Sequence, residues 1–499
     1  MRRRGFVLSG VVVCAVAAMH ASGCGNSDEG SLFHPTGDDD GGLGDGTGGD
    51  DGGGSSDSSC FGQSCGDGGG GGDTAPPCRG LQCMVNKSCP AKDGAPSTTS
   101  ISGKVFDPAG KQPLYNIVVY VPTDPMGKLP PIAPGTSSCN TCDANIGDIV
   151  AATLSDETGS FTLKNVPTGT QIPVVFQVGK WRREIFIQST TDCADTPIPN
   201  TLSRLPRNKT EGDMPQMAVL TGGCDPLACL FRRIGIDASE FTAPGGTGRM
   251  HVYKGIGGGD VQGGGAGDCT GATCPLWTQK TALEKYDIAL LSCECGENNQ
   301  TKPDKVPMHD WINEGGKVFA THYHYTWFKN GPMDFANTAN WTGVNNSAPF
   351  HVDTTFPKGQ AFVKWLVAVG AIVGGTDIPL NANDVRNSVG TVKPGAQRWI
   401  YTNPPEADKY FTFNTPIGGV PPGPDAGPDA GASYCGKAVF SDIHVSGSTS
   451  DAQTVPTTCQ IRDLTAQEKA LEFLFFDLSS CVTDDALPPE PPHPPPPPK

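Results

Sequence analysis

Five residues that can ligate a metal or act in nucleophilic catalysis lie at the ends of apolar runs in this sequence. They are Cys293 and Cys295, His322 and His324, and His444. Thiolate sulfur and imidazole nitrogen are ligands that zinc prefers, and a thiolate beside an imidazole is also an activated nucleophile. The sequence therefore indicates one of two kinds of site. One is a metal centre of His322, His324 and His444, and the other is a catalytic thiol at Cys293 or Cys295.

The elements that would position these residues are two short buried strands and a helix between them. Residues 286–293 and 317–325 are apolar runs of strand length, and the helix around 308–313 ends at Gly315 and Gly316. A strand, helix and strand in this order form a βαβ unit, in which both strands present their carboxyl ends at one edge of the sheet. Side chains alternate along a strand, so we expect His322 and His324 to share one face.

A third apolar run, residues 436–445, ends close to His444. If this run is a parallel neighbour of residues 317–325, His322 and His444 face the same crevice. Glu294 or Cys293 could then complete a metal site, with zinc as the possible cofactor. A structural role is also open, because histidines at strand ends often only bond loops. Trp311, Trp327 and Trp341 could stack a sugar or simply pack in the core.

The N-terminus has the pattern of an export signal. Residues 1–23 contain three arginines and an apolar run at 6–19 that is too short for a stable membrane span. The sequence Ala21-Ser22-Gly23-Cys24 resembles a bacterial lipobox, which implies cleavage before Cys24 and lipid attachment to its thiol. We therefore expect an exported protein whose membrane partner is the cell envelope, at the outer membrane or surface.

Export changes the interpretation of the 19 cysteines. Disulfides are the default in an oxidising compartment, and loss of Cys14 and lipidation of Cys24 leave an odd number, so at least one thiol stays free or pairs between chains. The closely spaced candidates are Cys139 with Cys142, Cys224 with Cys229, and Cys269 with Cys274. The pair Cys139-x-x-Cys142 favours a disulfide-closed loop over a zinc or redox site, because no second pair has matching spacing.

Composition predicts two folded domains joined by irregular segments. The 499 residues include 66 Gly and 45 Pro, and only 18% are charged. Residues 98–190 are short alternating runs between Gly, Pro and Asp turns, which predict an antiparallel β-sandwich. The expected order is a signal peptide (1–23), a tether (24–97), the sandwich (98–190), a linker (191–215), an α/β domain (216–482) with an insertion at about 330–433, and a Pro-rich tail (483–499).

The tether and the tail are expected to be disordered. Residues 25–73 are rich in Gly and Asp and contain no Lys or Arg, so they cannot bury enough apolar surface to fold. Their acidic runs lack the spacing of calcium-binding repeats, which favours a solvated tether. The net charge of -16 without basic clusters argues against nucleic acid as a partner.

Three segments of the predicted sandwich resemble a carboxypeptidase regulatory-like domain. They are GKVFD at 103–107, DETGSF at 156–161 and VPTG at 166–169. The resemblance covers nearly all of residues 98–190. It implies a transthyretin-like sandwich that serves as an accessory or adhesion module and carries no catalytic residues of its own.

The α/β domain resembles class I glutamine amidotransferases and their ThuA-like relatives in its strand order, its Gly315-Gly316 turn and its late His444. The resemblance implies a flavodoxin-like three-layer fold. These families place a cysteine nucleophile where this chain has His322, and a histidine where it has His444. Without that thiol the covalent step of amide hydrolysis is lost, so glutaminase activity is not expected.

Two functions fit these observations. The favoured one is a non-catalytic binding or adhesion protein, lipid-anchored to the envelope, with a glycan or protein partner at the cell surface. The alternative is a metal-assisted hydrolase that acts on surface glycans. The metal content of the purified protein distinguishes the two, because only the second requires a bound ion.

Overall fold

The computed structural model describes residues 78–91, 97–137, 139, 145–345, 348–420, 433–447 and 449–492. The predicted signal peptide, Cys24, most of the predicted tether, Cys142 and the end of the Pro-rich tail lie outside the described residues. Among the residues described, no helix is both long enough and apolar enough to cross a bilayer.

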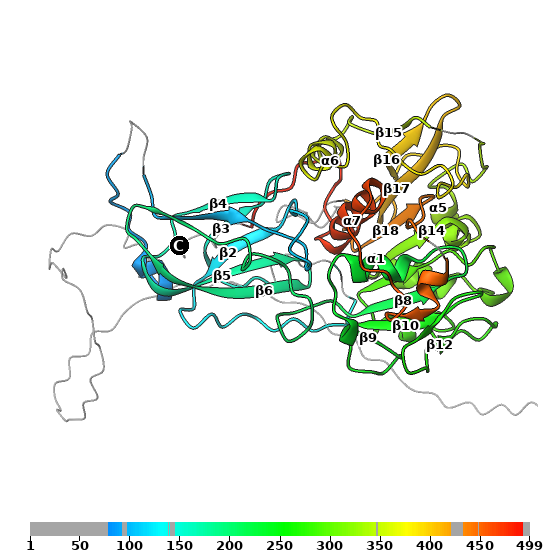
Figure 1. Ribbon diagram of the computed structural model, residues 1–499, viewed down its shortest axis with the longest axis horizontal. Helices are drawn as coiled ribbons and strands as arrows, with labels where there is room; N and C mark the ends of the chain where they lie inside the picture. Colours follow the sequence, from blue (N-terminus) through cyan, green and yellow to red (C-terminus); the bar gives the residue numbers. More distant parts are fainter. Residues whose placement is uncertain are drawn as a thin grey trace, which may run out of the picture. The chain divides into compact units, whose positions relative to one another are not determined.

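The first part of the described chain is a sandwich of two small sheets (Figure 1). One sheet has the order β3 (Ile149–Leu154), β2 (Val118–Pro122), β5 (Gly169–Val178) and β6 (Trp181–Thr190). The other has the order β4 (Ser160–Lys164), β1 (Ser100–Lys104) and β7 (Asp195–Pro197). All pairs are antiparallel except β1 with β7. Apolar side chains between the sheets, such as Val119, Phe161 and Phe176, are buried, as the alternating pattern predicts.

The sandwich extends beyond its predicted limits at both ends. The 3-10 helix η1 (Gly80–Met84) lies within the predicted tether, and its Leu81 is buried in the core. A disulfide joins Cys89 to Cys193, so a segment of the predicted tether is fixed to a segment of the predicted linker. Strand β7 also lies in that linker and pairs with β1. The sequence did not reveal these additions because each depends on a partner about 100 residues away.

A larger mixed sheet follows (Figure 1). Six of its strands are parallel, in the order β12 (Gly267–Asp268), β10 (Met250–Lys254), β8 (Met217–Thr221), β13 (Ile288–Leu291), β14 (Lys317–Thr321) and β18 (Gly436–Ser441). β17 (Ala407–Thr415), β16 (Gln397–Thr402) and β15 (Phe350–Val352) extend it as antiparallel strands, all from the predicted insertion. β9 (Phe241–Thr242) pairs with β10, and β11 (Asp260–Val261) pairs with β19 (Thr454–Val455) outside this sheet.

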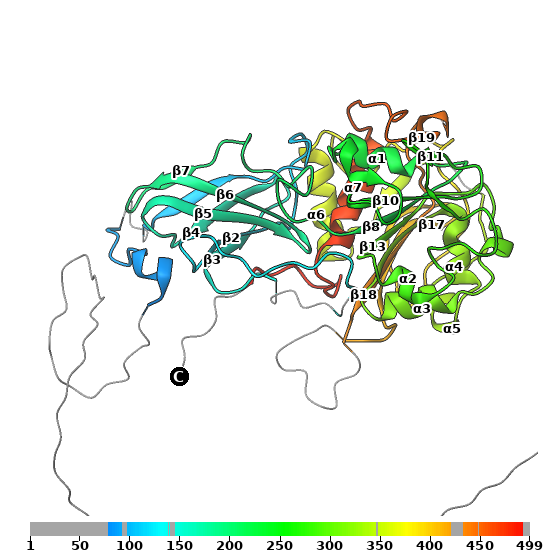
Figure 2. The same cartoon turned by 90° about the horizontal axis from the view of Figure 1, so that it is seen from below.

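Helices cover both faces of this sheet (Figure 2). Along β8, Met217 and Val219 join one apolar cluster, whereas Ala218 and Leu220 join the other, because strand side chains alternate. The first cluster includes residues of α1 (Leu227–Arg233), α6 (Pro357–Ala368) and α7 (Ala466–Ser479). The second includes residues of α2 (Lys280–Leu283), α3 (Val306–Asn313), α4 (Thr326–Lys329) and α5 (Met333–Ala336).

Two of the helices on the first face begin differently. Thr465 caps α7, because its hydroxyl accepts a hydrogen bond from the Glu468 amide while Glu468 accepts one from the Thr465 amide. No side chain caps the start of α1. Pro226 is the N-cap residue of α1. Asp225, which precedes it, accepts a hydrogen bond of 3.1 Å at Oδ1 from the Val445 amide. Asp225 thus turns toward the end of β18.

The sandwich and the larger sheet share one continuous core. Trp181 of β6 packs edge-on against Phe475 and Phe476 of α7, with ring centroids 6.3 and 6.1 Å apart. Lys180 pairs with Asp287, the residue before β13, at 2.5 Å. By their contacts, the described residues of both parts belong to one compact unit.

Candidate metal centre

Three side chains meet at the carboxyl ends of the neighbouring strands β13, β14 and β18. They are Cys293, His322 and His444, and one donor atom of each lies within 4.8 Å of the others. Cys293 Sγ is 3.2 Å from His322 Nδ1, and the two imidazole rings have centroids 5.3 Å apart. The strands are parallel in register, so residues that follow them arrive at the same edge. His322 and His444 are therefore neighbours at one edge of the sheet.

The chain turns sharply where His322 leaves the sheet. β14 ends at Thr321. His322 follows it with a left-handed φ of +43° and is the first residue of the 3-10 helix η4 (His322–Tyr325). The strand predicted to continue to residue 325 is therefore too long, and the prediction that His322 and His324 share a strand face is wrong. A left-handed non-glycine residue is strained by about 1–3 kcal/mol and persists only where surrounding structure imposes it. Such strain is common at functional sites.

Burial keeps these donors uncharged. It lowers the pKa of His322 to about 3, with a smaller effect from the Arg386 charge, and it lowers the pKa of His444 well below its ordinary value. Burial also raises the pKa of the Cys293 thiol to about 12. At neutral pH the cluster thus consists of two neutral imidazoles and one protonated thiol. Neutral imidazole is the form that binds metal, and a metal ion would displace the thiol proton.

Several polar atoms around the cluster have no hydrogen-bond partner among the described residues. Neither ring nitrogen of the buried His444 makes a hydrogen bond, although the Cys224 backbone lies close enough to raise the pKa of this ring. Asp225 is 1% exposed and its Oδ2 is also unpartnered. Burial raises the pKa of Asp225 to about 7, and this carboxyl acts electrostatically on Cys293. Unpaired buried polar groups are costly, so they point to a ligand that satisfies them.

The donor set fits zinc. Tetrahedral zinc binds sulfur at about 2.3 Å and imidazole nitrogen at about 2.0–2.1 Å, which places two such ligands about 3.5 Å apart. The Cys293 Sγ–His322 Nδ1 distance of 3.2 Å is close to that separation. Only His322 among the three residues is partly exposed, so solvent reaches the cluster from its side. Three protein ligands would leave a fourth position for water, as in catalytic zinc sites.

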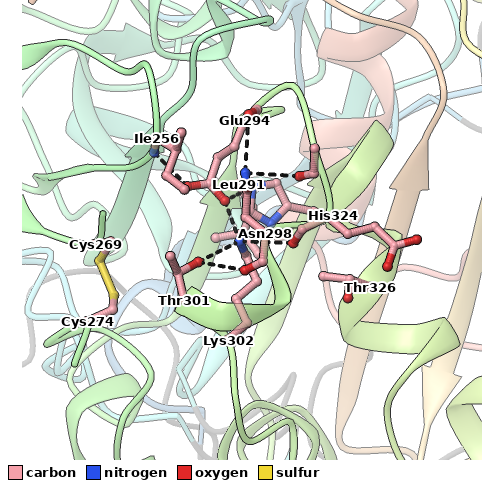
Figure 3. Close-up of polar contacts among 12 residues, drawn as sticks. Ile256, Cys269, Cys274, Leu291, Glu294, Asn298, Thr301, Lys302, His324 and Thr326 are labelled. Carbon is pink, nitrogen blue, oxygen red and sulfur yellow. Dashed lines mark hydrogen bonds and ion pairs between the residues drawn. A yellow bond between two sulfur atoms is a disulfide. The ribbon is translucent and has the colours of Figure 1, made fainter. Parts of the chain in front are cut away.

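His324 and Glu294 lie in a separate buried cluster (Figure 3). His324 Nε2 is 2.9 Å from the Ser292 carbonyl, and burial lowers its pKa well below the ordinary value, so the neutral ring donates this hydrogen bond. Glu294 forms a buried ion pair with Lys302 and accepts a bond of 2.8 Å from the Ile256 amide. Neither residue joins the trio, which corrects the predicted ligand role of His324. Both instead fix the loop that carries Cys293.

Six disulfides are formed among the described cysteines. They are Cys78–Cys83, Cys89–Cys193, Cys139–Cys435, Cys224–Cys295, Cys229–Cys459 and Cys269–Cys274. The predicted Cys269–Cys274 pair is confirmed. The pairing of Cys224 with Cys229 is wrong, and so is that of Cys139 with Cys142, because partners distant in sequence lie closer in the fold. Among the described residues, Cys293 is the free cysteine.

The catalytic-thiol hypothesis is weakened by these findings. Cys295 is bound to Cys224 and cannot act as a nucleophile while the disulfide persists. Cys293 is fully buried, and its raised pKa leaves almost no thiolate at neutral pH. The sequence signalled the free thiol only through the odd cysteine count, and nothing in it distinguished Cys293 from Cys295. It also gave no sign that Asp225 lies beside the cluster.

The three tryptophans near the site differ in exposure. Trp311 and Trp327 are buried in the core, at 0% and 1% exposure, and cannot stack a sugar. Trp341 is half-buried and packs against Tyr325.

No family model and no curated protein matches this chain. Among solved structures, a mutant type II cohesin–X-dockerin complex from Acetivibrio cellulolyticus is 18% identical, covers 21% of this chain and 56% of that chain, and has a TM-score of 0.13. The major pilin subunit of Bacillus cereus is 18% identical, covers 22% of this chain and 29% of that chain, and has a TM-score of 0.11. This chain thus spans little more than half of the first of these neighbours. Scores at this level identify neither fold nor function.

Proposed function

We propose that this protein is an exported, lipid-anchored, metal-assisted hydrolase whose zinc ion is held by Cys293, His322 and His444. The observation that carries this proposal is the convergence of the three donors within 4.8 Å at one sheet edge. Of the two functions left open by the sequence, this geometry favours the second. The two buried, unbonded ring nitrogens of His444 support it, because a metal ion would satisfy them.

The topology supports the proposal. The five central parallel strands run β10-β8-β13-β14-β18, which in chain order is 2-1-3-4-5. This order matches that of flavodoxin-like folds, in which ligands bind at the carboxyl edge where the strand order reverses, here between β8 and β13. Cys224 follows β8 and Cys293 follows β13, so the trio borders that point. We infer an amidotransferase-like domain that has exchanged its nucleophilic thiol for a metal ligand at His322.

The chemistry of such a centre is hydrolysis. Zinc with three protein ligands lowers the pKa of its bound water to about 7 and polarises a carbonyl, so hydroxide attacks at neutral pH. In this chain Cys293, His322 and His444 would hold the ion. Asp225, whose carboxyl acts electrostatically on Cys293, would add negative charge beside a centre of one thiolate and two neutral imidazoles.

Metal titration of the purified full chain tests the proposal. After chelation, we expect one equivalent of zinc to bind, and cobalt(II) in its place to show the absorption bands of tetrahedral thiolate ligation. Cys293→Ala and His444→Phe should each weaken binding by more than the roughly 10- to 100-fold typical of outer-shell changes. His351→Ala is the matched control, because His351 is a partly exposed histidine paired with Asp377 outside the site. Absence of stoichiometric metal would return the protein to the binding-module hypothesis.

The anchor is tested separately. Cys24→Ala should release the protein from membranes, because Cys24 carries the only lipid proposed. Retention of the variant in the membrane fraction would contradict lipid anchoring and leave the metal centre unaffected.

A further inference from the structure

A row of aromatic rings begins at the metal centre and runs along the adjacent surface. The His322 and Tyr323 rings have centroids 3.8 Å apart, and the steps from Tyr323 to Tyr325 and from Tyr325 to Trp341 are each 6.0 Å. His322 and the three following rings are all partly exposed. Buried core aromatics would explain one such contact, but a continuous, partly exposed row that starts at a proposed ligand indicates a binding surface.

Preorganised polar groups flank this row. Glu297 accepts a hydrogen bond of 2.7 Å from the Tyr325 hydroxyl, and the amides of Asn299 and Asn330 donate to its other oxygen at 2.8 and 3.2 Å. Lys329 lies 3.3 Å from Glu297 and 5.0 Å from the Tyr325 ring centroid. The pKa of Glu297 is lowered to about 2, mainly by the Tyr325 hydrogen bond. A surface carboxylate is seldom held by so many partners, and here they fix the planar groups beside the rings.

We propose that this aromatic row, Tyr323, Tyr325 and Trp341, binds the sugar rings of a carbohydrate substrate. Aromatic faces pack against the apolar faces of pyranose rings, and planar carboxylate and amide groups bond their hydroxyls. The Glu297 charge is compensated by Lys329, so the surface suits a neutral ligand better than a charged peptide or a phosphate. The inference rests on the proposed metal centre for its chemistry but not for its binding step.

The two features together specify the bond that is attacked. Glycosidic bonds are usually cleaved by two carboxylates, whereas zinc hydroxide attacks carbonyl carbon. The substrate class is therefore an acylated glycan. Hydroxide from water forms a new C–O bond at the acyl carbon, and the bond from that carbon to the sugar oxygen or nitrogen breaks. The remaining proton of the water goes to the sugar atom, which leaves a free carboxylic acid and a sugar alcohol or amine.

Binding of an N-acetylglucosamine tetramer to the metal-stripped full chain tests the proposal, with calorimetry and tryptophan fluorescence as readouts. We expect saturable binding, which Trp341→Ala weakens about tenfold or more, the value of one aromatic contact. Trp341 also packs against the buried Phe440, so Tyr323→Ala provides a second variant if the first fails to fold. Tyr401→Ala is the control, because Tyr401 is a partly exposed tyrosine on β16 that stacks with Arg398 outside the row.

Each outcome decides the matter. No saturable binding, or equal binding by the wild type, Trp341→Ala and Tyr323→Ala, would overturn the sugar site even if zinc binds stoichiometrically. Binding of a peptide with the sequence of residues 488–499 in place of the sugar would also overturn it, because proline-rich segments dock on aromatic surfaces too. Sugar binding that depends on the row in a protein without a zinc site would support this inference and refute the proposed hydrolase.

Discussion

The strands β13, β14 and β18 carry polar residues at both ends, and the two edges of the sheet differ in whether these residues have partners within the chain. At the amino edge these residues are Asp287, Lys317 and Lys437, and every one has partners within the chain. Asp287 accepts from Lys180 at 2.5 Å and from the Gln216 amide at 2.7 Å. Lys437 bonds Asp477 at 2.6 Å and Asp485 at 2.9 Å. The amino edge is electrostatically complete without a ligand.

At the carboxyl edge the corresponding residues are Cys293, His322 and His444. The only hydrogen bond between their donor groups is the 3.2 Å contact from Cys293 to His322, and both His444 nitrogens lack partners among the described residues. Both edges are comparably buried, so burial alone does not explain the difference. The carboxyl edge therefore has buried donor atoms that a ligand could satisfy, whereas the corresponding residues of the amino edge are satisfied by the chain itself.

The largest effect is expected from breaking the amino edge. Asp485 lies between Lys358 at 2.8 Å and Lys437 at 2.9 Å, and its pKa is held below the ordinary range by these two ammonium groups. Asp485→Ala leaves two buried cations without this partner, which should lower the free energy of unfolding by about 3–5 kcal/mol. Urea denaturation measures it, and zinc affinity should not change in the folded fraction.

Glu490→Ala is the control for this variant, since Glu490 is an exposed carboxylate of the same C-terminal segment. It should change stability by no more than about 0.5 kcal/mol. If Asp485→Ala were equally mild, the amino edge would not be the stabilising structure that its ion pairs indicate.

Sequence patterns predicted most elements of this sheet because they are local. β13 and β18 lie within the predicted runs 286–293 and 436–445, and α3 lies at the predicted helix around 308–313. The sequence patterns did not predict where β14 ends. Residues 317–325 form an apolar run followed by alternating His and Tyr, which predicts one continuous strand, yet the tertiary fold ends β14 at Thr321 and turns His322 into a left-handed conformation.

The sequence identified the types of residue at the site, but it did not identify which cysteine and which histidines belong to it. His322 and His444 were expected to meet, because parallel strands present their ends at one edge. The choice between Cys293 and Cys295 depended on Cys224, which comes from the end of another strand. Likewise His324 lies in a separate cluster with Glu294 and Lys302 and not in the metal site. That cluster forms only when the loop is folded. Such pairings are long-range and leave no local trace.

An intermediate effect is expected from a pair of buried histidines. His251 forms hydrogen bonds with the Tyr286 hydroxyl and the Gly246 carbonyl, each at 3.0 Å. Neither ring nitrogen of His444 forms a hydrogen bond with the described residues. His251→Phe should therefore destabilise the protein by about 1–3 kcal/mol, because it leaves bonded groups without partners. His444→Phe should be neutral or stabilising by about 1 kcal/mol in the metal-free protein, because it removes unsatisfied atoms at similar volume.

Thermal unfolding of the two phenylalanine variants without metal provides the measurement. With zinc added, the wild type should gain stability and His444→Phe should not, because only ligand binding to the native state stabilises it. A large loss of stability in metal-free His444→Phe would show that this ring serves the fold, and the contrast between the two edges would disappear.

The smallest effect concerns the pH dependence of the amino edge. Burial lowers the pKa of Lys317 from 10.5 to about 7, with Lys437 and Lys180 lowering it further and Asp287 and Asp477 opposing them. Between pH 7 and 10.5 the unfolded chain binds this proton and the folded chain does not, so stability from this group rises with pH across that window. Below pH 7 both states bind this proton, and the cost in stability is constant.

The Lys317→Met variant should lack this rise, so the difference in unfolding midpoint between wild type and variant should shift in favour of the wild type from pH 7 to pH 10. The shift should be modest, because the bonds of the ammonium to the Ser479 and Ser480 carbonyls offset part of the cost of its burial. A difference that does not vary with pH would mean that Lys317 titrates normally, and that its bonds to the Ser479 and Ser480 carbonyls compensate fully for its burial.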